Sequence, residues 1–368
     1  MSSYRLIKEG NTYLFVPPQS GIDGKGPGRK EREGFYNPAM EESRDISVIV
    51  AQTLVREMQD KEIRVLDGLS SVGARGLRIA NEVKGKLHVV LNDLNEKALH
   101  LAEKSIERNN LSNVSIRCDD LNATLSREGF HYIDIDPFGT PVPYIGMAVR
   151  RVLPKGILAV TATDTATLCG VYRKTCIRRY NAIPLRTWYM HEIGLRILLG
   201  YIIREGARFD RALYPLLSYS RRYYMRVYLR VERGARKADE VMKDIGMLRA
   251  YDFNFRRRMV GPLWKGELHD ARFLASLREE GRKRDFRNKR ILIKLLDRCA
   301  EEVGMPPFFY DLNILSSHFN RSPPKLNKLM GFLRKEGYRV SRTHFRDTSF
   351  KCDAPLDKVL EAFDVLTI

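Results

Sequence analysis

The chain has 368 residues, long enough for two domains with cores of their own, and its 43% hydrophobic and 30% charged residues are typical of a globular protein in water. No apolar run of about 18 residues and no apolar signal core appear, which argues against membrane insertion and secretion. The 64 Lys and Arg residues exceed the 45 Asp and Glu residues to give a net charge of +19. A polyanionic partner is the first hypothesis that this charge suggests.

The five cysteines are scattered and form no C-x-x-C pair. This spacing argues against a disulfide framework and a structural zinc site, and it fits a reducing cytoplasm. We therefore expect no bound metal, and no obligate protein partner is evident.

The N-terminal region is predicted to begin with a hairpin formed by Tyr4–Lys8 and Thr12–Val16. A flexible, basic loop follows at Gly21–Lys30, and it lacks the preceding strand and the Gly-Lys-Ser/Thr ending of a P-loop. After Phe35–Pro38, the apolar spacing in Met40–Gln59 predicts a helix.

Strands and helices then alternate, which predicts a doubly wound, mostly parallel α/β sheet with closing strands that make it mixed. The last closing strand is rich in Tyr and Arg, as an edge strand can be. The expected strands are Ile63–Asp67, Leu87–Asp93, Val114–Cys118, His131–Asp136, Gly156–Thr161, Arg211–Ser218 and Tyr223–Val231, and the expected helices are Gly73–Val83, Glu96–Asn109, Val142–Leu153 and Arg186–Glu205.

A domain boundary is expected near Gly261–Trp264, dividing the chain into residues 1–264 and 265–368. The second part is predicted to be a smaller, mainly helical α+β domain with a winged-helix-like part. Its expected elements are helices at Asp311–Phe319 and Pro324–Glu336, a hairpin of Tyr338–His344 and Ser349–Asp353, and a last helix at Leu356–Phe363.

Acidic residues follow three successive strands of the predicted sheet. Asp67 ends the first strand before a turn with several glycines, Asp93 ends the second, and Asp120 follows the third. Ligands of open parallel sheets bind at the carboxyl ends of the strands, where an acid in the place of Asp93 accepts from ribose hydroxyls. Because G-x-G-x-x-G is absent and the site is acidic, it suits a cationic, phosphate-free nucleoside such as S-adenosylmethionine better than NAD. The alternative for each acid taken singly is a helix cap or a solvated loop end.

The stretch Asp136-Pro137-Phe138-Gly139 breaks the fourth strand, since Pro137 lacks an amide hydrogen and Gly139 permits unusual backbone angles. An acid, a fixed main-chain carbonyl and an aromatic ring at such a turn suit the binding of the exocyclic amine of a nucleobase. The alternative is an ordinary turn in which Asp136 caps the next helix.

Residues 171–230 contain 13 basic residues, of which 12 are Arg, against three acidic ones. Arg interleaved with aromatic residues is typical of proteins that contact phosphates and stack on unpaired RNA bases. The aromatic residues singled out in this window are Tyr172, Tyr180, Trp188, Tyr189, Tyr219, Tyr223 and Tyr224, some of which must belong to the core.

Taken together, the motifs resemble those of the archaeal tRNA (guanine-26-N2)-dimethyltransferase family. They run in the family's order over most of the first 270 residues or so. The segments are Phe35–Pro38, Ser43–Asp45, Asp67–Arg78, Asn92–Asp93, Asp120–Asn122, Asp136–Gly139, Thr163–Ala166 and Gly261–Trp264.

This resemblance implies a class I (Rossmann-like) methyltransferase domain, S-adenosyl-L-methionine as the donor and tRNA as the partner, with residues 265–368 as a tRNA-binding domain. Arg44, Asp67, Arg75, Asp93, Asp120 and Leu121 would bind the cofactor, Arg44 through its methionine carboxylate. Asp136, Pro137 and Phe138 would be catalytic, and Phe35, Phe138, Gly139, Thr163 and Asp164 would bind the substrate. Some members carry a four-cysteine zinc cluster before Gly261, but 242–260 has no cysteine here.

In this interpretation Asp136 and the Pro137 carbonyl accept from the guanine amine and direct its lone pair to the methyl group. Whether Asp136 also takes the proton stays open, and Phe35 and Phe138 have the alternative of being ordinary core aromatics. Two rival functions remain: methylation of another amino group, such as adenine N6 or a different tRNA guanine, and RNA binding without catalysis.

Overall fold

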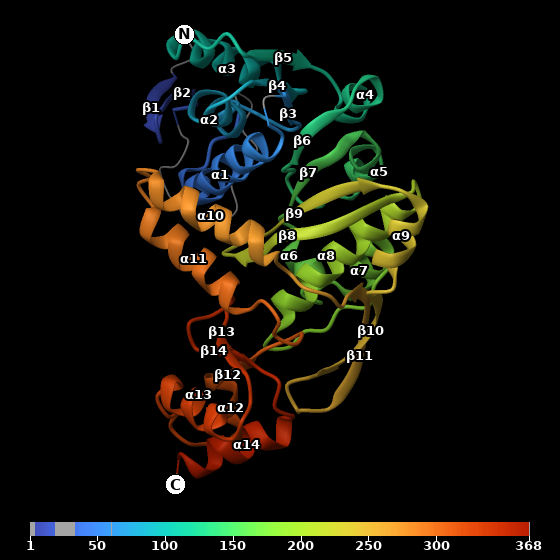
Figure 1. Ribbon diagram of the computed structural model, residues 1–368, viewed down its shortest axis with the longest axis vertical. Coiled ribbons are helices and arrows are strands. Elements are labelled where there is room, and N and C mark those ends of the chain that lie inside the picture. Colours follow the sequence, from blue (N-terminus) through green and yellow to red (C-terminus); the bar gives the residue numbers. More distant parts are fainter. Residues whose placement is uncertain (1–3, 19–33, 60, 368) are drawn as a thin grey trace.

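A seven-stranded mixed sheet forms the centre of the protein, as the computed structural model shows for residues 4–18, 34–59 and 61–367 (Figure 1). The strands lie in the order β5-β4-β3-β6-β7-β9-β8, and β9 alone runs against its neighbours. Their bounds are β3 (Ile63–Asp67), β4 (Leu87–Asp93), β5 (Val114–Cys118), β6 (Phe130–Ile135), β7 (Val152–Ala162), β8 (Arg211–Arg221) and β9 (Tyr224–Arg233).

The expectation of a Tyr- and Arg-rich edge strand at the end of this sheet is wrong. Strand β9 lies between β7 and β8, and β8 forms the edge. Two polar residues of β9 lie inside because each has a partner: Arg226 is fully buried against Asp134, and the Tyr228 hydroxyl lies 3.1 Å from Ser47 Oγ. The polar composition of β9 therefore led to the wrong prediction of which strand forms the sheet edge.

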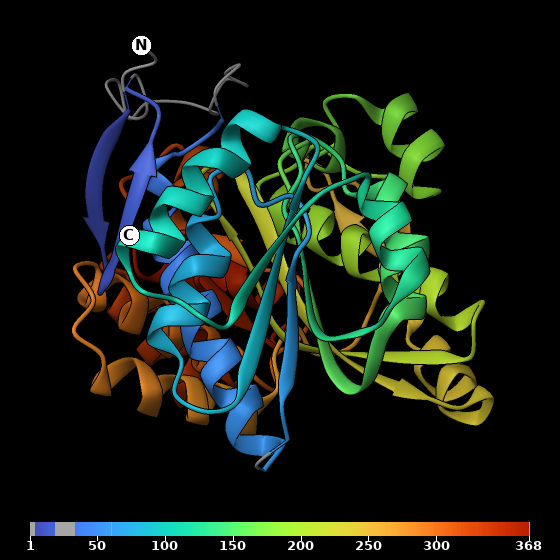
Figure 2. The ribbon, with the colours of Figure 1, turned by 90° about the horizontal axis from the view of Figure 1, so that it is seen from above.

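Helices cover both faces of the sheet, and Figure 2 shows the blue and cyan helices on one side and the green ones on the other. Side chains alternate along each strand, so Leu66 and Ile133 join one core while Val65 and Tyr132 join the other. The helices are α1 (Glu41–Glu57), α2 (Ala74–Glu82) and α3 (Glu96–Arg108) on one face and α4 (Leu121–Arg127), α5 (Val142–Arg151) and α8 (Met190–Ala207) on the other.

Several elements escaped the sequence analysis because they are short or irregular. Helix α4 has seven residues, and the eleven-residue β7 begins at Val152, four residues before the expected strand start at Gly156. Helix α8 begins four residues after the expected start at Arg186, since 186–189 are not helical and Trp188 and Tyr189 form a turn. Up to Trp264, the other unpredicted elements are η1 (Pro38–Met40), α6 (Thr165–Leu168), α7 (Arg173–Tyr180), α9 (Ala235–Met242), β10 (Ile245–Tyr251) and β11 (Arg257–Trp264).

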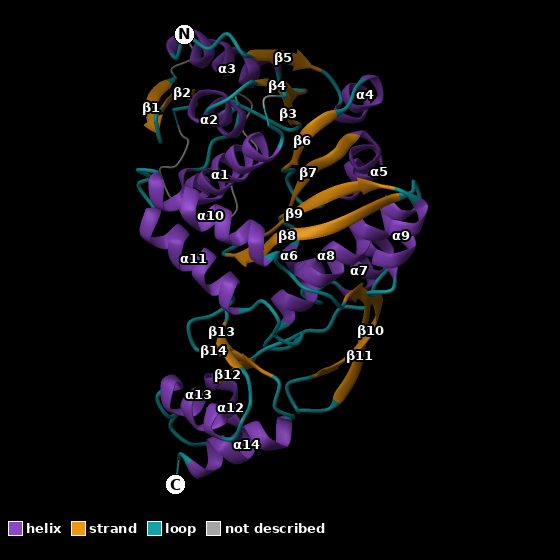
Figure 3. Ribbon diagram, viewed as in Figure 1, coloured by secondary structure: helices purple, strands orange, loops and turns teal. Residues whose placement is uncertain are grey.

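Smaller units surround the main sheet (Figure 3). The predicted N-terminal hairpin is present as β1 (Arg5–Glu9) and β2 (Thr12–Val16), and β10 and β11 form a second antiparallel pair. Helices α10 (Ala271–Lys283) and α11 (Lys289–Glu301) share the core of α1. The domain boundary near Gly261–Trp264 stays a prediction, and the loop Gly21–Lys30 lies outside the described residues.

The C-terminal part contains the predicted pair of helices followed by an antiparallel hairpin. These elements enclose a third core that includes Leu315, Leu329, Phe350 and Phe363. The unit consists of β12 (Tyr310–Asp311), α12 (Leu312–Phe319), α13 (Leu326–Lys335), β13 (Val340–Arg342), β14 (Ser349–Cys352) and α14 (Leu356–Val365).

No helix in the described part of the chain combines the length and apolarity needed to cross a membrane.

Candidate active site

A cavity of about 820 Å³ opens at the carboxyl edge of the parallel strands, where a ligand site is expected. Of the predicted site residues, eleven line it and two, Gly139 and Asp164, do not. The eleven are Phe35, Arg44, Asp67, Arg75, Asp93, Asp120, Leu121, Asp136, Pro137, Phe138 and Thr163.

Two backbone amides hold the carboxylate of Asp93 in place at the end of β4. Its Oδ2 accepts from the amide of Ser71 at 2.7 Å, and its Oδ1 accepts from that of Asn95 at 2.8 Å. Each carboxylate oxygen keeps a further lone pair. The carboxylate is therefore fixed and still able to accept from a pair of hydroxyl groups on a ligand.

Asp120 begins α4 as its N-cap, where its Oδ1 accepts from the amides of Asn122 at 2.9 Å and Ala123 at 3.2 Å. This capping explains why a seven-residue helix is stable directly after β5. The cap also places the neighbouring Leu121, which is buried, in the cavity wall.

Asp67 lies deeper, with 3% of its surface exposed. Its Oδ2 accepts from the amide of Gly76 at 2.8 Å, which ties β3 to the start of α2. Burial, together with the nearby Asp134 carboxylate, raises the pKa of Asp67 to about 7. The turn after it must be compact, because a Cβ on Gly68 would lie 2.9 Å from the carbonyl oxygen of Asp134.

Arg44 is committed to a partner that the sequence did not reveal. Its Nε donates to Glu9 Oε1 at 2.6 Å, its Nη2 donates to Glu9 Oε2 at 2.5 Å, and Nη2 also contacts the carbonyl of Asn37. Burial opposes ionisation of Glu9, but Arg44 and Arg78 hold its pKa at about 2. The charge of Arg44 is thus largely balanced inside the protein, and its predicted contact with a ligand carboxylate stays a prediction.

Arg75 joins the cavity floor to the predicted catalytic acid. It forms an ion pair with Asp136, its Nη1 donates to Ser47 Oγ at 2.6 Å, and its Nε lies 3.5 Å from Asp134 Oδ1. Arg226 donates to both carboxylate oxygens of Asp134. Although burial opposes ionisation, Arg226 and Arg75 hold the pKa of Asp134 below its usual value.

The turn after Asp136 is fixed by Thr163. Thr163 Oγ1 accepts from the amide of Gly139 at 2.6 Å, and the Thr163 amide donates to the Gly139 carbonyl at 2.9 Å. Gly139 has a φ of +87°, a conformation that side-chain-bearing residues rarely adopt. Asp164 accepts from the Tyr180 hydroxyl at 2.7 Å. Gly139 and Asp164 therefore support the turn from outside the cavity.

Two aromatic rings stand beside the turn. Phe35 and Phe138 lie edge to face, with centroids 4.8 Å apart and planes at 78°, and Phe138 is 53% exposed. An exposed ring at a cavity wall leaves a face free for another flat group. The alternative that Phe138 is a core aromatic is therefore wrong, whereas Phe35 is half-buried.

The cavity also contains residues for which no individual role was predicted. Arg222, Tyr223 and Tyr224 come from the turn between β8 and β9, and Ser71 and Asn95 line the cavity beside Asp93. The mixture of Arg and aromatic residues in 171–230 was the available signal for the first three.

For most of its aromatic residues, the Arg-rich and aromatic segment 171–230 wrongly indicated stacking on RNA bases. Buried rings cannot stack on an RNA base, and of the seven only Tyr172 and Tyr223 are exposed, at 60% and 55%. The buried ones are Tyr180, Trp188, Tyr189, Tyr219 and Tyr224.

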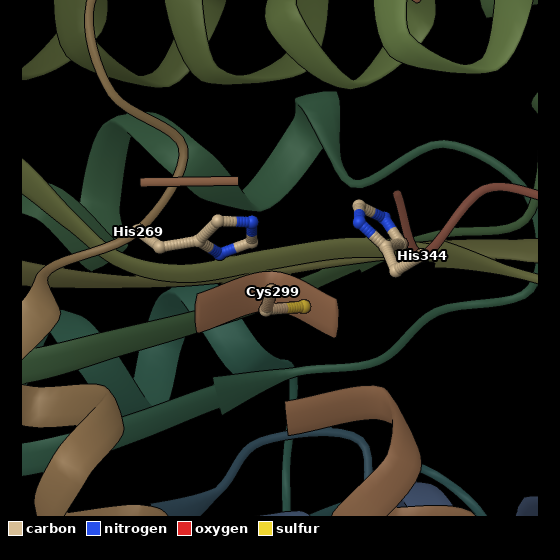
Figure 4. A group of neighbouring side chains, drawn as sticks. All are labelled: His269, Cys299 and His344. Carbon is tan, nitrogen blue, oxygen red and sulfur yellow. The ribbon is translucent and has the colours of Figure 1, made fainter. Parts of the chain in front are cut away.

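A second group of possible ligands lies outside the cavity wall. His269, Cys299 and His344 each place a donor atom within 4.8 Å of the other two (Figure 4). One nitrogen of each histidine, however, accepts a backbone N–H from the edge strand β8: His269 Nδ1 from Ser218 at 3.4 Å, and His344 Nε2 from Ser220 at 3.3 Å.

A neutral imidazole that accepts through one nitrogen carries its proton on the other, which then offers no lone pair to a metal. In agreement, His344 Nδ1 lies 2.6 Å from Glu302 Oε1, and burial lowers the pKa of His269 to about 3. These contacts favour capping of the sheet edge. The expectation of no bound metal stays a prediction.

The sheet order, the acids at three strand ends and the cavity between them define a class I, Rossmann-like methyltransferase domain. A family model described as N2,N2-dimethylguanosine tRNA methyltransferase matches residues 25–252 and 248–364. The chain belongs to this family.

Individual relatives match over nearly the whole chain. A tRNA (guanine(26)-N(2))-dimethyltransferase of Methanothermobacter thermautotrophicus is 39% identical, covering 96% of this chain and 97% of the relative. One of Methanobrevibacter smithii is 35% identical, covering 100% and 99%. The structure of Trm1 from Pyrococcus horikoshii with S-adenosyl-L-methionine has a TM-score of 0.86 and 31% identity, covering 97% of this chain and 99% of that one.

Proposed function

We propose that this protein transfers two methyl groups from S-adenosyl-L-methionine to the exocyclic N2 of guanine 26 in tRNA, giving N2,N2-dimethylguanosine. The observation that carries the proposal is one continuous cavity that contains both the acids suited to a nucleoside cofactor and the turn suited to a base amine. Family membership supports the same reaction.

The residues present fit the cofactor. Asp93 offers a fixed carboxylate to the ribose hydroxyls, and Asp120 and Leu121 offer an acceptor and an apolar surface to the adenine. Arg44, Asp67 and Arg75 line the inner wall. When bound, the cofactor supplies an electrophilic methyl group on a sulfonium.

Asp136 and the Pro137 carbonyl orient the guanine amine. Arg75 occupies Asp136 Oδ2, and within the described residues Asp136 Oδ1 has no hydrogen-bond partner. This oxygen and the Pro137 carbonyl accept hydrogen bonds from the two amine hydrogens. These bonds localise the lone pair on the nitrogen and direct it towards the methyl group to be transferred. For the second transfer, the monomethylated amine rotates and presents its remaining hydrogen to Asp136.

Phe35 and Phe138 hold the base, which must leave its stack in the tRNA to enter the cavity. Thr163, Gly139 and Asp164 contribute by keeping the turn in place. Residues 265–368 bind the tRNA body, supported by exposed side chains of Arg282, Lys283, Arg287 and Arg290. We place the reaction in the cytoplasm.

The test uses purified protein, an unmodified tRNA transcript and methyl-labelled S-adenosyl-L-methionine, with nucleosides identified by mass spectrometry. We expect dimethylguanosine from position 26, and a loss of about 100-fold or more in Asp136→Asn with cofactor affinity retained. Methyladenosine or a guanine modified elsewhere would replace the proposal by the rival enzyme. Absence of transfer and of cofactor binding would leave only RNA binding.

A further inference from the structure

The turn between β8 and β9 lies on the catalytic edge of the sheet. Strand β8 runs parallel to β7 because both are antiparallel to β9. The carboxyl end of β8, at Arg221, therefore lies on the same edge as Asp67, Asp93 and Asp136, and the chain turns there before β9 begins. Arg222 and Tyr223 form this turn and line the cavity.

This turn lies on the far side of Asp136 from the cofactor acids. In the sheet order, β5, β4 and β3 precede β6, whereas β7, β9 and β8 follow it. Strand β9 is two positions from β6, or about 10 Å at the usual strand spacing. The cavity thus extends from Asp136 away from the cofactor acids, farther than a single base contact requires.

The flanking residues anchor the turn firmly. Arg221 Nε donates to Glu42 Oε2 at 3.0 Å, and Glu42 is 6% exposed on α1. Tyr224 is 4% exposed and packs edge to face on Tyr219, with ring centroids 6.0 Å apart. The turn is therefore held at both ends while the residues between are presented to the cavity.

The two presented residues have the chemistry of a nucleotide site. Tyr223 is 55% exposed, and among the described residues neither its ring nor its hydroxyl has a partner. Arg222 is exposed, donates to the carbonyl of Ala39 at 3.3 Å, and forms no ion pair with a described carboxylate. An unpartnered aromatic face beside a guanidinium whose charge is not paired with a described carboxylate suits an unpaired base and its phosphate.

We propose that Tyr223 stacks on the base next to the target guanine and that Arg222 binds the phosphate joining the two nucleotides. This inference rests on the proposed function, because it takes tRNA as the substrate. Phe35 and Phe138 already provide the rings beside Asp136, so Tyr223 serves the neighbouring nucleotide. The turn thereby selects tRNAs in which that nucleotide is also unstacked.

The first experiment compares Tyr223→Leu with Tyr223→Phe in steady-state methylation of the tRNA transcript. Leucine keeps apolar bulk but loses the ring, so we expect KM for tRNA to rise at least about fivefold. Phenylalanine keeps the ring and should remain within twofold of wild type. In both variants cofactor affinity, measured by calorimetry, should be unchanged. An unaltered KM in Tyr223→Leu would overturn the inference.

The second experiment replaces the nucleotide on either side of the target, in turn, by an abasic site. For one of the two substrates, Tyr223→Leu should cause no further loss, because the stacked base is already missing. If Tyr223→Leu weakens methylation of both abasic substrates by the same factor as that of the intact transcript, the neighbouring base is not the partner of Tyr223.

For Arg222→Ala, the slope of log KM against log salt should fall by about one, whereas Arg222→Lys should keep it. An unchanged slope in Arg222→Ala would reject the phosphate contact. If wild type itself makes no dimethylguanosine, the proposed function fails; if it does and the turn variants match it, this inference alone fails.

Discussion

Asp67 is an acid in a place that disfavours its charge. Burial and Asp134 raise its pKa to about 7 from a usual value of 3.8. Because the pKa of Asp67 is higher in the folded than in the unfolded protein, protonation of Asp67 stabilises the folded state. This stabilisation is complete below pH 3.8 and is lost as the pH rises towards 7. Asp67 therefore makes the folded state less stable as the solution approaches neutrality.

The variant Asp67→Asn should remove this dependence, since the amide oxygen can still accept from Gly76. Between pH 5 and pH 7 wild type should lose up to about 1.4 kcal/mol per pH unit relative to the variant. Urea unfolding at several pH values measures the difference. Parallel pH profiles of the two proteins would show that Asp67 is already ionised.

Arg75 is expected to act chiefly through Asp136, because its three nitrogens already contact Asp136, Ser47 and Asp134. A lysine cannot make these contacts together. In Arg75→Lys we expect kcat to fall about tenfold and the cofactor Kd to change less than threefold. A large rise in Kd with normal kcat would assign Arg75 to the cofactor instead.

At the scale of elements, the N-terminal hairpin is part of the site. Glu9 at the end of β1 binds Arg44 of α1 and Arg78 of α2, so three elements meet at one carboxylate. No local pattern indicates such a contact, because its members are separated by 35 and 69 residues. Only the fold reveals it.

The variant Glu9→Gln should destabilise the protein by about 3 kcal/mol, since it leaves the buried Arg44 guanidinium without its charge partner. It also removes one of the three carboxylates paired with Arg78, which keeps Asp45 and Glu82. The pKa of Glu9, lowered to about 2 from 4.5, gives a stabilisation that is present above pH 4.5 and lost towards pH 2. Thermal unfolding between pH 2 and pH 7 should show a steeper loss of stability in acid for wild type than for the variant, which keeps the contributions of Glu302 and Asp134. Glu240→Gln, in an exposed pair with Lys243, is the control and should resemble wild type.

The sequence predicted regular elements well and their lateral order poorly. Strands β3, β4 and β5 match their expected bounds. Strands β3 and β4 are largely apolar and end in an acid, whereas β5 alternates apolar and polar residues directly before Asp119. The interior place of β9 could not be foreseen, because it depends on Asp134 accepting Arg226 from 92 residues away. The role of Arg75 could not be predicted for the same reason, because it too depends on ion pairs with residues far away in the sequence.

At the scale of the molecule, a buried lysine joins the C-terminal unit to the catalytic domain. Lys351 of β14 is 1% exposed, and its Nζ lies 2.7 Å from Glu192 Oε1 on α8 and 3.2 Å from the Pro306 carbonyl. Trp188 adds a hydrogen bond of 2.9 Å to the Phe309 carbonyl. Polar groups of each part are therefore hydrogen-bonded to groups of the other.

Lys351→Met should lower the free energy of unfolding by about 3 kcal/mol, because Glu192 loses a buried partner. Lys358→Met, which breaks an exposed pair with Glu361, is the matched control and should leave the stability nearly unchanged. Chemical denaturation followed by tryptophan fluorescence measures both. Equal midpoints for the two variants would mean that the buried pair contributes little.

The reversal of β9 has a consequence for how such enzymes diversify. Because one strand runs backwards, the chain returns to the catalytic edge through a hairpin, and a hairpin turn tolerates changes of length and residue that a sheet interior does not. The cofactor acids lie three to five strands away from this turn in the sheet order. Under the proposal that this turn binds the tRNA, the choice of nucleic-acid substrate can evolve at one end of the sheet while the methyl-donor site at the other end stays the same.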